Sequence, residues 1–115
     1  MAHDILIVDD EVDIRDLVSG ILSDEGYGAR TAADSDSALA AIQVRLPSLI
    51  VLDIWLDGSE LDGLELLSLA HGIDPDLPVI MITKNEEEWL MEEAIAAQIS
   101  NYLTKPVNPS QILIA

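Results

Sequence analysis

Three carboxylates in this sequence stand where apolar runs end. Asp9 and Asp10 follow the run 5–8, and Asp53 follows the run 49–52. Carboxylates brought within a few ångströms repel one another, so a shared site needs a cation. Oxygen ligands without Cys or His fit Mg²⁺, which keeps several waters. If the fold unites them, Asp9, Asp10 and Asp53 predict a Mg²⁺ site in which Asp53 keeps an oxygen free to accept a phosphoryl group.

A hydroxyl and an ammonium group follow two later apolar runs. Thr83 comes after the run 77–82, and Lys105 comes after the run 101–104. A transferring phosphoryl group carries spread negative charge, which cations and hydrogen-bond donors stabilise. Singly, Thr83 could be an ordinary strand-end hydroxyl and Lys105 a solvated loop lysine, just as the acids could be helix caps. Their joint placement favours phosphoryl transfer involving Asp53, Thr83 and Lys105.

Short continuous apolar runs predict strands that are buried on both faces. The five predicted strands are centred on 5–8, 28–31, 49–52, 77–82 and 101–104. Helices are predicted between them, and a last short helix starts near 108–110. Strand and helix alternate five times, which predicts one α/β domain over residues 1–115 with a parallel sheet and helices on both faces. A doubly wound sheet of this kind would bring the polar strand ends to one edge.

The predicted helices rest on apolar spacing and on capping residues. Asp10 is the predicted cap of the first helix, and Gly26 helps to end it; its apolar stripe is Ile14, Leu17, Val18, Ile21 and Leu22. The second helix begins at 34–36 and ends at Pro47; it carries Ala38, Ala41, Ile42 and Leu46. The third carries Leu64, Leu67 and Ala70 and is closed by Gly72 and Pro75. A fourth is expected over 86–98.

Composition narrows the function classes. Twenty-two acids against five bases give a formal charge of −17, which disfavours direct binding of nucleic acid by this chain. No apolar run approaches the roughly 20 residues of a membrane helix, so no membrane contact is expected. With no cysteine and no signal-like N-terminus, the chain is predicted to be cytoplasmic. We assign no role to His3 and His71.

The sequence resembles the receiver domain of bacterial two-component response regulators over essentially its whole length. The matching residues are the acidic pair Asp9-Asp10, Asp53, Thr83 and Lys105-Pro106. The resemblance implies a flavodoxin-like, five-stranded doubly wound fold of strand order 2-1-3-4-5. It implies that Asp53 accepts a phosphoryl group from a phosphohistidine of a sensor histidine kinase, with Mg²⁺ as cofactor. The domain would not be a classical enzyme, although it would phosphorylate and dephosphorylate itself.

The resemblance also implies roles for individual residues. The backbone carbonyl of Trp55 would be a further metal ligand, and Thr83 and Tyr102 would form the switch pair. Signalling would change the face made of the fourth helix, the fifth strand and the last helix. Two copies of the chain are expected to be able to pair through this face as a homodimer. That last helix is truncated compared with the family.

Some residues depart from the family pattern. Asp57 occupies the usual proline position, Asp62-Gly63 arrives about two residues late, and Lys84 replaces the small residue after the switch Thr. The first half is similar to NtrX-type receivers, and the second half is similar to PorX-type receivers. This mixture leaves a natural and a hybrid origin both open.

Three other functions fit the sequence less well. A Mg²⁺-dependent phosphatase of the haloacid-dehalogenase kind would need a second Asp where Trp55 stands. A flavin binder would need a phosphate loop where Asp9 and Asp10 stand. A degenerate receiver acting as a binding module is disfavoured by the intact set of five residues.

Overall fold

The computed structural model describes residues 4–53, 63–83 and 101–104. Strands and helices alternate along most of this length. The strands are β1 (Asp4–Val8), β2 (Gly28–Ala32), β3 (Leu49–Asp53), β4 (Val79–Thr83) and β5 (Asn101–Thr104). The helices are α1 (Val12–Asp24), α2 (Ser35–Val44) and α3 (Gly63–Ile73). The predicted fourth and last helices lie outside the described residues.

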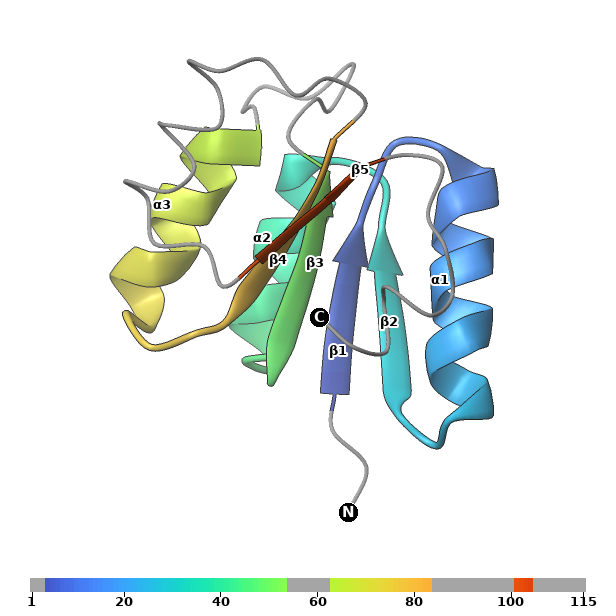
Figure 1. Ribbon diagram of the computed structural model, residues 1–115. Helices are drawn as coiled ribbons and strands as arrows, with labels where there is room; N and C mark the ends of the chain where they lie inside the picture. Colours follow the sequence, from blue (N-terminus) through green and yellow to red (C-terminus); the bar gives the residue numbers. More distant parts are fainter. Residues whose placement is uncertain (1–3, 54–62, 84–100, 105–115) are drawn as a thin grey trace.

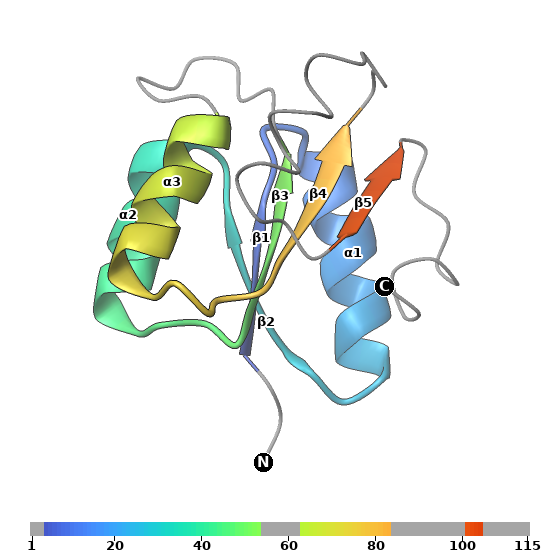
Figure 2. The same cartoon turned by 60° about the vertical axis from the view of Figure 1, so that its left-hand side comes forward.

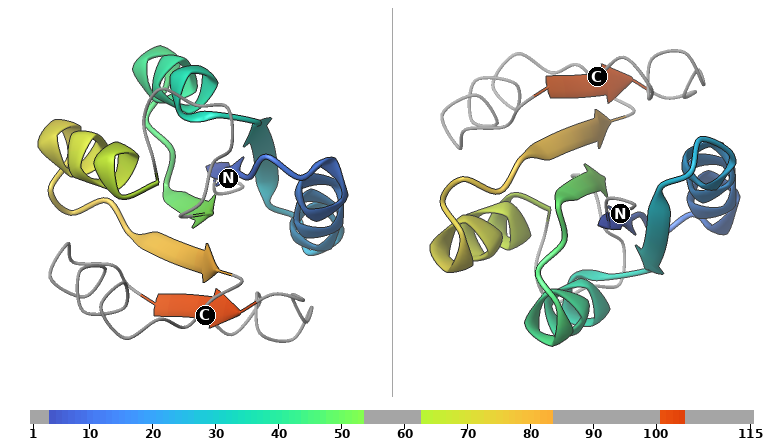
Figure 3. Two further views of the ribbon diagram at one scale, coloured as in Figure 1. Left: turned by 90° about the horizontal axis from the view of Figure 1, so that it is seen from above. Right: turned by 90° about the horizontal axis from the view of Figure 1, so that it is seen from below.

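The strands form one parallel sheet at the centre of the molecule. Four of them lie in the order β2-β1-β3-β4, and β5 pairs in parallel with β4 at the edge. Viewed along the strands, α1 covers one face of the sheet, and α2 and α3 lie together on the other (Figure 3). Figures 1 and 2 show that all the strands point the same way, so their carboxyl ends share one edge. The predicted parallel α/β sheet with helices on both faces is confirmed.

Alternate residues of the central strands enter two separate apolar clusters. Leu6 and Val8 of β1 belong to the cluster packed under α2 and α3, which we call the helix-pair cluster. Ile5 and Ile7 belong to the cluster packed under α1. Because successive strand side chains point to opposite faces, a strand covered on both sides must be apolar throughout. This explains the continuous apolar run that predicted β1.

The sequence prediction for α1 is correct in its position but wrong in two details. Val18 and Leu22 are buried, whereas Leu17 is 41% exposed. Leu17 lies about 100° around the helix from Val18, which puts it at the edge of the buried stripe. The N-cap is Glu11, without a side-chain capping bond, and not Asp10 as predicted. A carboxylate oxygen of Asp10 lies in a cluster of carboxylates, described below.

The helix α2 begins with the predicted cap. The Oδ1 of Asp34 accepts the backbone N–H of Ser37 at 2.7 Å, and the two residues form a capping box. Its end differs from the prediction, because α2 stops at Val44 and Leu46 lies beyond it. Arg45 already has extended backbone, with φ −157° and ψ 125°, so the chain leaves the helix before Pro47.

The segment from α3 to β4 also differs from the prediction. The helix α3 runs through Gly72 to Ile73, since the N–H of Asp74 still donates to the carbonyl of Ala70 at 2.9 Å. Pro75 then prevents Asp74 from continuing the helix. The strand β4 starts at Val79, two residues later than predicted.

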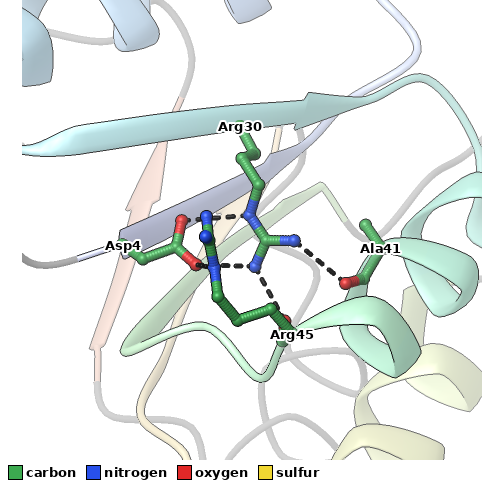
Figure 4. A network of polar contacts seen from close by, with 4 residues as sticks. All are labelled: Asp4, Arg30, Ala41 and Arg45. Carbon is green, nitrogen blue, oxygen red and sulfur yellow. Dashed lines mark hydrogen bonds and ion pairs between the residues drawn. The ribbon is translucent and has the colours of Figure 1, made fainter.

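An ion-pair network ties the amino edge of the sheet to α2 (Figure 4). The guanidinium of Arg30 binds both carboxylate oxygens of Asp4, at 3.0 and 2.7 Å. It also donates to the carbonyls of Ala41 and Arg45, at the carboxyl end of α2. The Nε of Arg45 lies 2.9 Å from Asp4. One guanidinium therefore joins β1, β2 and α2.

This network predicts an acid-dependent stability contribution. Burial raises the pKa of Asp4, but hydrogen bonds and charge from Arg30 and Arg45 outweigh burial and leave the pKa below its ordinary value. A carboxyl whose folded pKa is lowered stabilises the fold above its unfolded pKa, about 3.9, and this contribution disappears as pH falls through the folded pKa. Asp4→Asn should therefore destabilise the chain at pH 6, and its cost should shrink towards pH 3.

Urea unfolding of parent and variant at both pH values measures this difference. Other carboxyls titrate in both proteins and cancel in the comparison. A cost that stays constant between pH 6 and pH 3 would show that the charge of Asp4 is not the source of the stabilisation.

Among the described residues, no helix has both the length and the apolar character needed to cross a bilayer.

Candidate functional site

The strand register brings two of the predicted acids side by side. Val8 of β1 pairs with Leu52 of β3. Asp9 directly follows Val8 and the end of β1, and Asp53 directly follows Leu52 as the last residue of β3, so both lie at the carboxyl edge of the sheet. Both are almost fully buried, at 1% and 3% exposure. Their proximity follows from the parallel pairing of the two residues just before them.

The third predicted acid joins this pair. Asp9, Asp10 and Asp53 each place a carboxylate oxygen so that the three oxygens lie within 4.8 Å of one another. Asp10 is only partly buried, and it therefore forms the more accessible side of the group. We call these three residues the acidic cluster. The predicted convergence of Asp9, Asp10 and Asp53 is confirmed.

The loop between β1 and α1 holds Asp9 through backbone and side-chain hydrogen bonds. Its N–H donates to the carbonyl of Ala32 at 3.1 Å, and its Oδ1 accepts the N–H of Glu11 at 2.8 Å. Its carbonyl accepts a hydrogen bond from Nη1 of Arg15 at 2.8 Å. The position of Asp9 is thus set by β2, by the loop and by α1 together.

The other predicted site residues are placed only in part. Asp53 pairs with Ile82 of β4, so the backbone of Thr83 reaches the same edge one residue further on. Thr83 in turn pairs with Thr104, the last residue of β5, and Lys105 follows it in sequence. Lys105 and Trp55 lie outside the described residues. Tyr102 lies on β5, where it pairs with Met81.

The chemistry of the acidic cluster fits Mg²⁺. All three donors are carboxylate oxygens, the hard ligands that this ion prefers. Ligand oxygens in an octahedron of about 2.0–2.1 Å radius lie roughly 3–4 Å apart. Oxygens already within 4.8 Å reach that spacing through small side-chain rotations. The residues that the structure describes here therefore suit an acid-rich magnesium site.

Charge repulsion within the acidic cluster is large. Two unit charges 4.8 Å apart repel by roughly 3 kcal/mol at an effective dielectric constant of about 20. Water around the half-buried Asp10 screens the repulsion between its carboxylate and the other two. The cluster nevertheless holds three acids in a small and largely buried volume, and a bound divalent cation would relieve the repulsion.

Besides the Arg30 network, two further contacts were not predicted from the sequence. Arg15 reaches back six residues from α1 to the carbonyl of Asp9. No role was expected for His71, but its Nε2 lies 3.0 Å from the carbonyl oxygen of Leu77. This contact links the end of α3 to the segment just before β4. The one sequence signal for Arg15 is that it is the first base in a strongly acidic chain, five residues after Asp10.

Comparison with known proteins agrees with this fold. Residues 5–115 match the family described as Response regulator receiver domain. The chain therefore belongs to the response regulator receiver domains of two-component systems. Response regulators are generally not classical enzymes. The chain has their flavodoxin-like fold with a parallel sheet.

Among individual relatives, the NtrX proteins are prominent. Nitrogen assimilation regulatory protein NtrX of Azorhizobium caulinodans is 53% identical over 114 residues, which are 99% of this chain and 25% of that protein. The crystal structure of NtrX from Brucella abortus has a TM-score of 0.93 and 53% identity, and covers 99% of this chain and 25% of that one. A CheY-like receiver domain protein from Methanospirillum hungatei JF-1 has a TM-score of 0.92 and 35% identity, covering 99% and 90% of the two chains.

The chain thus spans about a quarter of the length of these NtrX relatives. The predicted similarity to NtrX-type receivers is confirmed, and it extends over nearly the whole chain. The similarity of the second half to PorX-type receivers, and a hybrid origin, stay predictions.

Proposed function

We propose that this domain is a phosphorylation-dependent signalling switch in which Asp53 accepts a phosphoryl group from a phosphohistidine of a sensor histidine kinase. The observation that carries the proposal is the acidic cluster at the carboxyl edge of the sheet. In the transfer, the bond between phosphorus and the imidazole nitrogen breaks, and its electron pair stays on the nitrogen. A bond between phosphorus and an oxygen of Asp53 forms at the same time.

Asp9, Asp10 and Asp53 would hold the Mg²⁺ ion, together with the backbone carbonyl of Trp55. The ion would supply positive charge close to the phosphoryl oxygens. The burial of Asp9 and Asp53 supports this assignment, because a low effective dielectric strengthens attraction to a cation. Asp53 lies at the end of the central strand β3, where the rigid sheet fixes the position of the acceptor oxygen.

Thr83 and Lys105 would stabilise the phosphoryl group with a hydroxyl and an ammonium. The strand register supports this for Thr83, since β4 pairs with β3 and Thr83 directly follows Ile82, the partner of Asp53. Lys105 follows Thr104, which pairs with Thr83, in the sequence. Thr83 would then act with Tyr102 of β5 as the switch pair. The same groups would assist attack of water on the acyl phosphate, which gives the domain its own dephosphorylation activity.

The sensor kinase is the principal proposed partner. A homodimer could use the face formed by residues 86–98, β5 and the last helix. The formal charge of −17 supports a receiver that does not itself contact nucleic acid. We place this function in the cytoplasm, where a kinase and a Mg²⁺ pool are both available.

Labelling with acetyl phosphate tests the proposal. The parent chain should acquire one acid-stable, base-labile phosphoryl group when Mg²⁺ is present, and chelation should prevent labelling. Asp53→Asn should abolish labelling because the amide is a far weaker nucleophile than the carboxylate. Beryllium fluoride, a phosphoryl mimic, should bind the parent under the same conditions.

Asp76→Asn is the matched control, since Asp76 is an exposed acid in the turn before β4, at the opposite edge of the sheet. It should label like the parent. Equal labelling of Asp53→Asn would exclude Asp53 as the acceptor. A parent chain that binds Mg²⁺ but takes up no phosphoryl group would instead be a degenerate receiver that acts as a binding module.

A further inference from the structure

Three consecutive peptide groups around the acidic pair are each held by a hydrogen bond. The peptide before Asp9 donates its N–H to Ala32, at 3.1 Å. The peptide that joins Asp9 to Asp10 accepts from Nη1 of Arg15 through its carbonyl, at 2.8 Å. The peptide after Asp10 donates the N–H of Glu11 to Oδ1 of Asp9, at 2.8 Å. Because a peptide group is planar, each bond fixes the orientation of a whole plane.

Asp10 lies between the second and third of these planes. Its φ and ψ are the rotations that relate the two planes, so anchoring both planes limits both angles. The direction of the Cα–Cβ bond, and hence the reach of the Asp10 carboxylate, follows from them. Of the two anchors next to Asp10, one comes from Asp9 itself, and the other comes from the side chain of Arg15.

We propose that Arg15 is a positioning residue for the acidic cluster. By binding the carbonyl of Asp9, it orients the Asp9–Asp10 peptide and so holds the Asp10 carboxylate ready for a divalent cation. This inference rests on the proposed function, because it assigns Arg15 to the magnesium site of that function. Arg15 suits the role because it is half-buried and its guanidinium stays charged, so it donates at every relevant pH.

Positioning and electrostatics predict opposite effects on metal affinity. Arg15 carries a positive charge close to the acidic cluster, and a positive charge alone repels a divalent cation. If charge were its main effect, removal of the guanidinium would tighten metal binding. If Arg15 positions Asp10, removal of the guanidinium weakens binding, because the cation must then hold a peptide that has lost one of its hydrogen bonds. The direction of the change therefore separates the two explanations.

Manganese titration followed by electron paramagnetic resonance provides the test, since free Mn²⁺ is measured directly and Mn²⁺ accepts the same oxygen ligands as Mg²⁺. Arg15→Met keeps an apolar stem and removes the donor. We expect its Kd for Mn²⁺ to rise about 10-fold, at the lower end of the usual effect of residues that orient metal ligands. Arg15→Lys, which keeps a single donor, should recover part of the affinity.

The matched control is Arg45→Met, because the side chain of Arg45 is 66% exposed and lies at the amino edge of the sheet. This variant loses the same charge far from the acidic cluster, so its Kd should change by less than about two-fold. Circular dichroism checks that each variant folds. If Arg15→Met does not fold, Arg15→Gln removes the charge and shortens the reach, and it should show the same loss of affinity.

The outcomes separate this inference from the proposed function. Suppose that the parent binds Mn²⁺ and that Asp53→Asn does not. If a folded Arg15→Met then binds Mn²⁺ as tightly as the parent or more tightly, the inference is wrong and the proposed function stands. A fall in thermal stability with unchanged Kd overturns it equally, because Arg15 is then structural only. If the parent itself binds no Mn²⁺ or Mg²⁺, both the inference and the proposed magnesium site fail.

Discussion

Asp53→Asn is expected to stabilise the metal-free chain by about 1–3 kcal/mol and to remove the stabilisation that Mg²⁺ gives the parent. The substitution deletes one of three carboxylate charges that lie within 4.8 Å of one another. Each pair contributes a repulsion of roughly 3 kcal/mol before solvent screening, and Asp53 takes part in two pairs. Part of the gain is offset, because the buried amide must replace the polar contacts of the carboxylate.

Mg²⁺ should have the opposite effect on the two proteins. A ligand that binds only the folded state stabilises it by RT ln(1 + [L]/Kd), which is about 2.7 kcal/mol when its concentration is 100 times Kd. For a domain of this size that corresponds to a rise in Tm of roughly 10 °C. The parent should therefore gain stability as Mg²⁺ is added, whereas Asp53→Asn should gain little. The order of stability of the two proteins should reverse along the titration.

Thermal melts monitored by circular dichroism, with chelator and across a Mg²⁺ series, measure both effects. Asp76→Asn, the exposed acid at the other edge of the sheet, should follow the parent within about 0.5 kcal/mol. A less stable Asp53→Asn in chelator would mean that repulsion in the acidic cluster is already neutralised within the folded chain. Parallel Mg²⁺ curves for parent and Asp53→Asn would remove Asp53 from the metal site.

The acidic cluster could be predicted from sequence because parallel pairing leaves little freedom. Once the runs ending at Val8 and Leu52 are taken as neighbouring strands, Asp9 and Asp53 have to emerge at the same edge. The apolar runs lack alternation because these strands are buried on both faces, and their short length and polar flanks favour strands over helices. The same few residues therefore predict both the fold and the acidic cluster.

The errors lie where several residues compete for one role. Three successive acids, Asp9 to Glu11, precede α1, and each has the chemistry of a helix cap. Only the tertiary structure decides that Asp10 belongs to the acidic cluster and that Glu11 is the N-cap. The exposure of Leu17 has a similar origin, because residues at the border of an amphipathic stripe are buried or exposed according to how the helix is rotated on the sheet.

Contacts between a long side chain and a distant carbonyl leave no periodic signal at all. Arg30 binds Asp4, 26 residues earlier in the chain, and also the end of α2. Arg15 bonds to a backbone oxygen, for which any residue type would serve as partner. Hydrophobic periodicity determines which face of an element is buried, but it carries no information about which basic residue reaches which carbonyl.

Leu6→Ala is expected to lower the free energy of unfolding by about 3–5 kcal/mol, a large share of the stability of an ordinary small domain. Leu6 is 0% exposed and lies in the middle of β1. It belongs to the helix-pair cluster, which also contains residues of β2, β3, β4, α2 and α3. Its neighbours are held by the sheet, so they cannot close the cavity that Ala leaves, and the cavity adds to the lost transfer free energy.

Two comparisons make this prediction specific. Leu6→Met nearly conserves volume and should cost less than about 1.5 kcal/mol, so a similar loss in both variants would argue against a cavity effect. Val44→Ala removes apolar atoms from a side chain that is 84% exposed, and it should stay within about 0.5 kcal/mol of the parent. Urea unfolding with unchanged m-values measures all three variants. A cost below about 1 kcal/mol for Leu6→Ala would contradict the packing described here. Asp9 and Asp10 directly follow β1, so the packing that holds this strand in place also holds the acidic cluster together.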